Sequence, residues 1–166
     1  MLTVLALLAA AASNPGLTKP KPPVMPVLAM TDCDNAKTRD ARLIEIDDDK
    51  SWTGSADRFN AAWKDYLDTR LAKLGLSKSE EDAFLGKIAN SAPFVALQAE
   101  NEKILAKMSA DFESIGDNPS DAQACKTVSG MLATLAPMLA NAGKQYELID
   151  SAITAEAKRR GVSLDD

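Results

Sequence analysis

The chain has 166 residues, of which 26% are charged and 46% hydrophobic, the size and composition of one soluble globular domain. Its net charge of −5 argues against nucleic-acid binding, because contacts with phosphates need a basic surface. The chain contains no histidine, which excludes histidine general bases, Ser-His-Asp and Cys-His nucleophiles, imidazole metal sites and histidine-ligated haem.

The sequence opens with an apolar run over residues 1–12. A membrane-spanning helix needs about 20 residues, so the run is too short to cross a bilayer, but it has the length of a signal-peptide core. Ala10, Ala11 and Ala12 fit the small-residue cleavage pattern, although no basic residue precedes the run. The alternative is a buried N-terminal helix. We predict a signal peptide over residues 1–12 and a periplasmic or secreted protein.

Residues 13–30 form the next segment, which has five prolines between Pro15 and Pro26. Such a composition favours an extended backbone and is typical of a tether between two parts of a chain. No later segment has the length and hydrophobicity of a transmembrane helix. The folded domain is therefore expected over residues 31–166.

The domain is predicted to begin with a helix over residues 32–46 that is capped by Thr31. A second helix should start with Ser55 as its cap, and apolar residues then recur at helical spacing. Gly75 is placed to end this helix in the left-handed conformation that glycine adopts without strain.

Ser77 and Glu80 form a capping-box pattern, so another helix should begin directly after this turn. A turn of this length predicts two antiparallel neighbours. Pro93 then interrupts the apolar pattern, since proline kinks a helix interior and is tolerated at a helix start. Either Ser91 caps a new helix or one long helix bends at Pro93, and we favour the bend.

Residues 116–121 predict a second hairpin, with Gly116 ending a helix, Asn118 as the next N-cap and Pro119 at the first helical position. Apolar residues then recur in steps of three and four, forming a heptad seam of Cys125, Val128, Leu132, Leu135, Leu139, Ala142, Tyr146, Ile149 and Ile153.

The seam keeps its phase through Pro137 and Gly143. This continuity predicts one kinked helix of about 40 residues rather than two helices, ending at Gly161. The expected fold is all-α, an elongated antiparallel bundle of three to four helices with kinks near Pro93 and Pro137.

Cys33 and Cys125 are the two cysteines and lie 92 positions apart. Reflecting the helices through their turns brings the two residues within about 14 Å of each other along the bundle axis. An exported protein favours a disulfide between them, and two buried free thiols are the alternative. In the chain-entropy model, this loop gives an upper figure of about 4.5 kcal/mol of stabilisation. The bond should fix the N-terminal helix beside the turn at residues 116–121.

Two residues are candidates for a pocket inside the bundle. Asn101 is a polar residue on an otherwise apolar seam, where it either fixes helix register or lines a pocket. Tyr66 would contribute to such a pocket if the helices bring it close to Asn101 near Pro93. The register role of Asn101 is the simpler interpretation.

The acidic run Asp47, Asp48 and Asp49 does not have the pattern of a calcium loop. An EF-hand loop needs glycine at its sixth position and glutamate at its twelfth, where this sequence has Trp52 and Arg58. We expect a solvated turn, with no metal, no cofactor and no catalytic residue in the chain.

These features predict an exported, non-enzymatic helical-bundle protein that acts by binding another macromolecule. A protein partner is expected, with an envelope-associated or chaperone-like role as one version, and nucleic acid is not. The alternative is a protein that binds a small molecule or a cation in a pocket inside the bundle. A hydrolase that depends on carboxylates is a weaker third possibility.

Overall fold

A computed structural model describes residues 18–114 and 118–164 of the chain. Within these ranges the protein has one short 3₁₀ helix, five α-helices and no strand, which confirms the predicted all-α class. No described helix has the length and hydrophobicity to span a membrane. The predicted signal peptide over residues 1–12 and the predicted stop at Gly116 lie outside the described residues.

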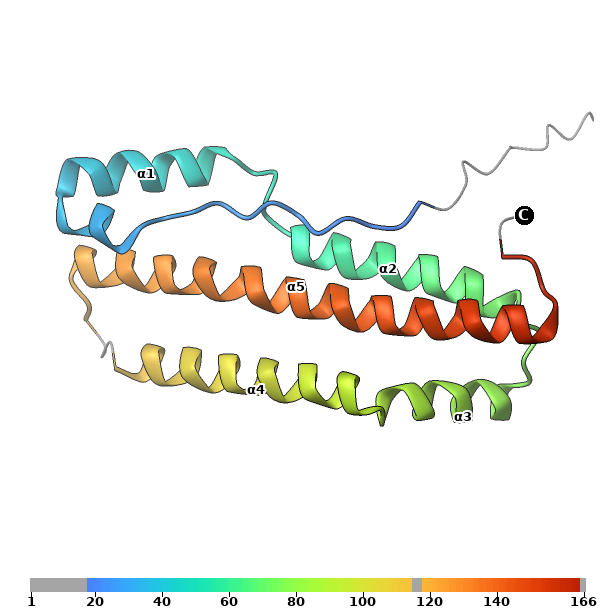
Figure 1. Ribbon diagram of the computed structural model, residues 1–166. Helices are drawn as coiled ribbons and strands as arrows, with labels where there is room; N and C mark the ends of the chain where they lie inside the picture. Colours follow the sequence, from blue (N-terminus) through green and yellow to red (C-terminus); the bar gives the residue numbers. More distant parts are fainter. Residues whose placement is uncertain (1–17, 115–117, 165–166) are drawn as a thin grey trace, which may run out of the picture.

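The elements follow in the order η1 (Met30–Asp34), α1 (Ala36–Asp48), α2 (Ser55–Ala72), α3 (Lys78–Ala89), α4 (Ala92–Glu113) and α5 (Asp121–Arg160). Helix α5 runs the length of the molecule, with α1 and α2 along one side and α3 and α4 along the other (Figure 1). Helices α2 and α4 each pack on α5 and make no close contact with each other. Instead of the expected bundle of three to four helices, the described residues form an open, elongated arrangement of four α-helices around α5.

Residues 18–29 form no regular structure and run along α5 in the opposite direction (Figure 1). At one end, the Lys19 ammonium pairs with Glu147 and lies 3.3 Å from Asp150 Oδ2. At the other end, Leu28 is buried and its carbonyl accepts a 2.6 Å hydrogen bond from Ser129 Oγ. The segment expected to be a tether is thus fixed to the helical domain over its described part.

Helix α1 starts later than predicted, because the chain first forms η1, which includes Thr31. The N-cap of α1 is Asn35, whose side chain accepts a hydrogen bond from a backbone N–H of the first turn. Helix α2 likewise has Gly54 at its N-cap, with φ of 68°. Ser55 is its first helical residue, and its hydroxyl donates to the Ser51 carbonyl instead of capping the helix.

The turn between α2 and α3 has the predicted chemistry. Gly75 has φ of 62°, in the left-handed region. Ser77 and Glu80 form the predicted capping box, in which each side chain bonds to the backbone N–H of the other residue. Both helices pack on α5, however, and they do not form the pair of close neighbours that the short turn predicts.

The long helix expected to bend at Pro93 is two helices. Helix α3 ends at Ala89, and α4 begins at Ala92 with Ser91 as its N-cap, so the bend was the wrong alternative. Pro93 lies in the first turn of α4, where a backbone N–H has no partner within the helix in any case.

Helix α5 is continuous from Asp121 to Arg160 through Pro137 and Gly143, as the seam predicts. The kinks expected at the two prolines are not confirmed. Gly161 ends the helix with φ of 69°, after three basic residues in its last turn.

The start of α5 differs from the prediction by two residues. Ser120 is the N-cap, and it forms a capping box with Gln123. Asn118 and Pro119 therefore precede the helix. The sequence contains both capping patterns, and the capping box satisfies two backbone groups where an Asn cap satisfies one.

The predicted disulfide is confirmed by the positions of its two sulfur atoms. Cys33 Sγ and Cys125 Sγ lie 2.00 Å apart, and both residues are only 1% exposed. They form a small core with Leu28 and Leu132 that joins η1 and the start of α5. The bond therefore fixes the N-terminal elements to the central helix.

Candidate functional site

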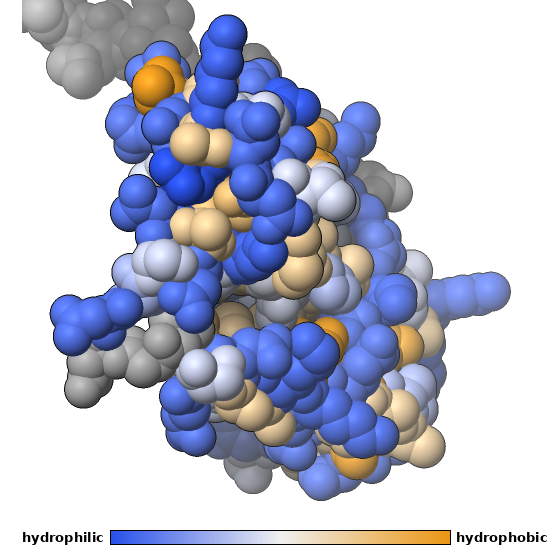
Figure 2. Space-filling view, turned by 90° about the vertical axis from the view of Figure 1, so that its left-hand side faces the viewer, coloured by the Kyte–Doolittle hydropathy of each residue, from blue (hydrophilic) through white to orange (hydrophobic). Residues whose placement is uncertain are grey.

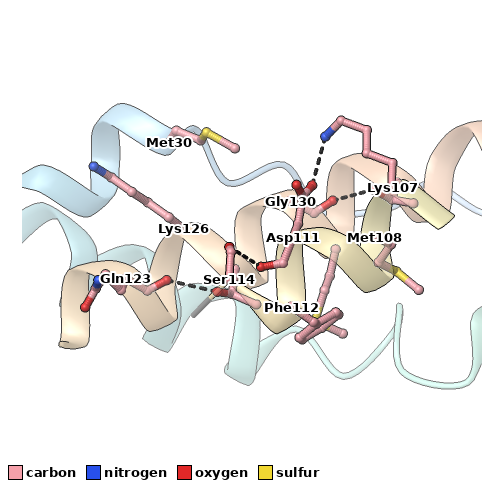
Figure 3. A pocket seen from close by; sticks show the side chains of 12 residues that line it. Met30, Lys107, Met108, Asp111, Phe112, Ser114, Gln123, Lys126 and Gly130 are labelled. Atoms are coloured by element: carbon pink, nitrogen blue, oxygen red, sulfur yellow. Dashed lines mark hydrogen bonds and ion pairs between the residues drawn. The ribbon is translucent and has the colours of Figure 1, made fainter. Parts of the chain in front are cut away.

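A groove opens between the end of α4 and the start of α5, with a volume of about 350 Å³ (Figure 3). We call it the methionine groove, and its main residues are Met30, Lys107, Met108, Phe112, Lys126 and Met131. Three elements contribute, since Met30 belongs to η1. Methionine side chains are flexible and polarisable, and they adapt to differently shaped apolar partners.

The level of α4 against α5 is set by a polar pair. Asn141 Nδ2 donates a 3.1 Å hydrogen bond to Asn101 Oδ1, and Asn141 is only 2% exposed. Because the helices are antiparallel, counting from this pair brings Phe112 level with Gly130. A Cβ atom added at Gly130 would meet no atom within 4 Å, so the groove is open above this glycine.

Apolar side chains of the groove are accessible to solvent. Phe112 is 41% exposed, Met131 38% and Met30 57%, and α4 has no buried residue in its whole length. Figure 2 views this end of the molecule, where apolar side chains lie among polar ones and a hollow separates the upper and lower parts of the surface. The groove is therefore able to bury apolar groups of a partner.

The charges at the rim of the methionine groove are balanced. Lys107 Nζ lies 2.8 Å from Asp111 Oδ2, and Lys126 Nζ lies 2.5 Å from Asp34 Oδ1. Each lysine thus has a carboxylate partner, and the rim does not select a strongly charged ligand. The groove offers apolar contact with polar edges, the composition that protein interfaces have at their core and rim.

A second groove, of about 440 Å³, lies between α2, α3 and α5. Its lining is mainly apolar and includes Leu67, Leu71, Leu85, Ile149 and Ile153. We call it the apolar groove.

The rim of the apolar groove is polar. Lys64 pairs there with Asp68, and the Tyr146 hydroxyl donates a 3.0 Å hydrogen bond to Asn60 Oδ1. The Asp68 carboxylate raises the pKa of Lys64, chiefly through its hydrogen bond. Lys64 is thus held in its charged form beside an apolar surface.

The structure does not bring the two predicted pocket residues together. Asn101 lies in the α4–α5 interface with Asn141, which suits the predicted register role. Tyr66 lies on the other side of α5, buried in an aromatic cluster with Trp63, and burial raises the pKa of its hydroxyl. A joint pocket of Asn101 and Tyr66 near Pro93 is not formed.

One polar cluster was not anticipated from the sequence. Asp150 is 7% exposed on α5, and its Oδ1 lies 2.9 Å from Arg70 Nε, at ion-pair distance but not aligned for a hydrogen bond. Arg70 also donates to Thr154 Oγ1 at 2.9 Å. The Glu147 carboxylate raises the pKa of Lys19, chiefly through its hydrogen bond, and Lys19 Nζ also lies 3.3 Å from Asp150 Oδ2. This cluster joins α2, α5 and the N-terminal segment.

Comparisons with protein families, curated proteins and solved structures found no match for this chain.

The acidic run at the end of α1 forms local contacts. Asp47 Oδ1 lies 2.6 Å from Lys50 Nζ, and Asp49 accepts a 3.0 Å hydrogen bond from the Ser51 backbone N–H. The hydrogen bonds from Ser51 hold the pKa of Asp49 below its usual value. In the described ranges, no three histidine, cysteine or acidic residues gather in a way that would hold a metal ion.

Proposed function

We propose that the protein is exported and acts without catalysis, by binding another macromolecule through the exposed apolar side of α4 and α5. The observation that carries this proposal is the incomplete burial of α4. None of its residues is buried, and Leu105 and Phe112 are 42% and 41% exposed. A helix of 22 residues that packs mainly on α5 keeps an apolar surface that a partner would cover.

Export is supported by two features. The Cys33–Cys125 disulfide is compatible with an oxidising compartment, where such bonds form and persist. The apolar run over residues 1–12 has the length of a signal-peptide core. We therefore propose a protein partner in the cell envelope or outside the cell.

The binding proposal is tested by retention of a partner from an envelope fraction. The tagged protein should retain a partner, and Phe112→Ser should lose it because the main apolar anchor of the groove becomes polar. Val24→Ser is the matched control, since Val24 is 91% exposed on the N-terminal segment and lies outside the groove. Quantitative mass spectrometry compares the three samples. A partner that both variants retain equally, or no partner with the unmodified protein, would contradict the proposal.

The alternative function is binding of a small apolar molecule in the apolar groove between α2, α3 and α5. Its volume of about 440 Å³ and its leucine and isoleucine lining favour this second candidate. Protein purified from its own cells should then carry a bound small molecule in native mass spectrometry. Leu85→Gln should reduce the bound fraction, because Leu85 lines the groove and is only partly buried. A spectrum with the mass of the protein alone would be evidence against this candidate.

A further inference from the structure

The α4–α5 pair has an apolar side that remains partly accessible to solvent. Leu105 and Phe112 are seven residues apart, so they lie on the same side of α4. Met131 and Met138 repeat the same spacing on α5, with Met131 38% exposed and Met138 half-buried. We call the pairs Leu105–Met138 and Phe112–Met131 the two rungs.

The level of the two rungs follows from the hydrogen bond between Asn141 and Asn101. Counted from this pair, the members of each rung are level to within one residue, about 1.5 Å. Leu105 and Phe112 follow Asn101 and Met108 of α4 by four positions, and Met131 and Met138 follow Thr127 and Thr134 of α5 by four positions. Asn101 lies in the α4–α5 interface, and the other three residues line the groove between the two helices. In an antiparallel pair such positions lie on the same side, and Phe112 and Met131 do line one groove. The rungs are thus one heptad, about 10.5 Å, apart along the pair.

The size of this side fits an interface between two copies of the chain. Helix α4 has 22 residues. A helix of this length extends about 33 Å, and two neighbouring helices are about 20 Å wide. This footprint is close to what a dimer of standard size needs, about 800 Å² from each partner.

The charge pattern also favours a second copy over a charged partner. The whole chain has a net charge of −5, so two copies repel each other unless the contact surface is neutral. The four rung residues carry no charge, and the lysines at the edge of the methionine groove are paired with carboxylates. A neutral, apolar contact surface therefore lets two negatively charged copies associate without placing like charges opposite each other.

We infer that the macromolecule bound at this side is a second copy of the chain, an inference that rests on the proposed function. The α4–α5 pairs of the two copies pack face to face about a two-fold axis as a four-helix bundle. The axis lies between the rungs, so Leu105 of one copy faces Phe112 of the partner subunit. Leu105 and Phe112, which are exposed in one chain, become part of the core of the dimer.

The test measures the molecular mass of the full chain by sedimentation equilibrium. The unmodified protein and Val24→Glu should be dimers at micromolar concentration. Phe112→Glu should raise the dimer dissociation constant at least about tenfold, because it places a charge in the interface. Leu105→Lys should do the same as a second, independent variant. Both sites are about two-fifths exposed, and circular dichroism verifies that the variants stay folded.

A mixture of the L105K and F112E variants tests the two-fold geometry. If Leu105 faces Phe112 of the partner subunit, the mixture gains one opposite-charge contact and should form heterodimers more tightly than either variant forms homodimers. A monomeric unmodified protein, or dimers that neither substitution weakens, would overturn the inference. A monomer that still retains an envelope partner through Phe112 would leave the proposed function standing, so the two failures are distinguishable.

Discussion

Replacing both Cys33 and Cys125 by alanine should lower the free energy of unfolding by about 2–5 kcal/mol. The bond closes a loop with a sequence separation of 92 residues, so its loss releases a large restriction on the unfolded chain. Both residues are 1% exposed, and the substitution also removes packing against Leu28 and Leu132. Urea unfolding followed by circular dichroism measures the change.

The loss should be greatest in the N-terminal elements, because η1 and α5 are the only helices on which α1 packs. Without the bond, trypsin should cleave at Arg42, whose side chain is 47% exposed, faster than in the unmodified protein. Cleavage at Arg70 is the internal control, since this residue lies on α2 beside Asp150 and its side chain is 13% exposed. A loss of stability below about 1 kcal/mol with unchanged cleavage at Arg42 would show that the packing alone fixes these elements.

Local signals predicted much of the fold because they act within a few residues. The capping box at Ser77, the left-handed glycines at the helix ends and the seam of α5 each depend on neighbouring backbone groups. The sequence pattern at Pro93 was ambiguous for a physical reason. Proline at the first turn of a helix and proline at a kink present the same apolar periodicity on both sides.

The candidate site was not predicted, because it depends on which helices touch. The heptad seam predicts that one side of α5 is buried. Asn141 and Asp150 are also buried, although they lie on sides of the helix where the sequence predicts exposure to solvent. Their burial is understandable only from their partners Asn101 and Arg70, which come from distant parts of the chain. The exposure of Phe112 likewise depends on tertiary packing, because α4 packs mainly on α5. No pattern within α4 indicates it.

Trp63→Ala should lower the free energy of unfolding by about 3–5 kcal/mol, the usual cost of emptying a large core position. Trp63 is 1% exposed, and its ring stacks on Tyr146 at 5.4 Å and meets the Tyr66 ring edge-on at the same centroid distance. The indole therefore joins α2 to α5 at the centre of the larger core cluster. Denaturant unfolding of the variant measures the loss, and Trp52 remains as a fluorescent reporter.

Trp63→Phe distinguishes the stabilisation that comes from the volume of the indole from any stabilisation that comes from its N–H group. No atom of the described residues accepts a hydrogen bond from the buried Trp63 Nε1, so removal of this N–H costs no hydrogen bond within the chain. The phenylalanine variant should then lose less than about half of what the alanine variant loses, since only part of the volume is missing. Lys19 lies 5.7 Å from the centre of the Trp63 ring, so the N-terminal segment should become more sensitive to trypsin in the alanine variant than in the phenylalanine variant. Equal losses in both variants would instead mean that the indole N–H has a partner in solution, and that the cluster depends on a polar contact as well as on packing.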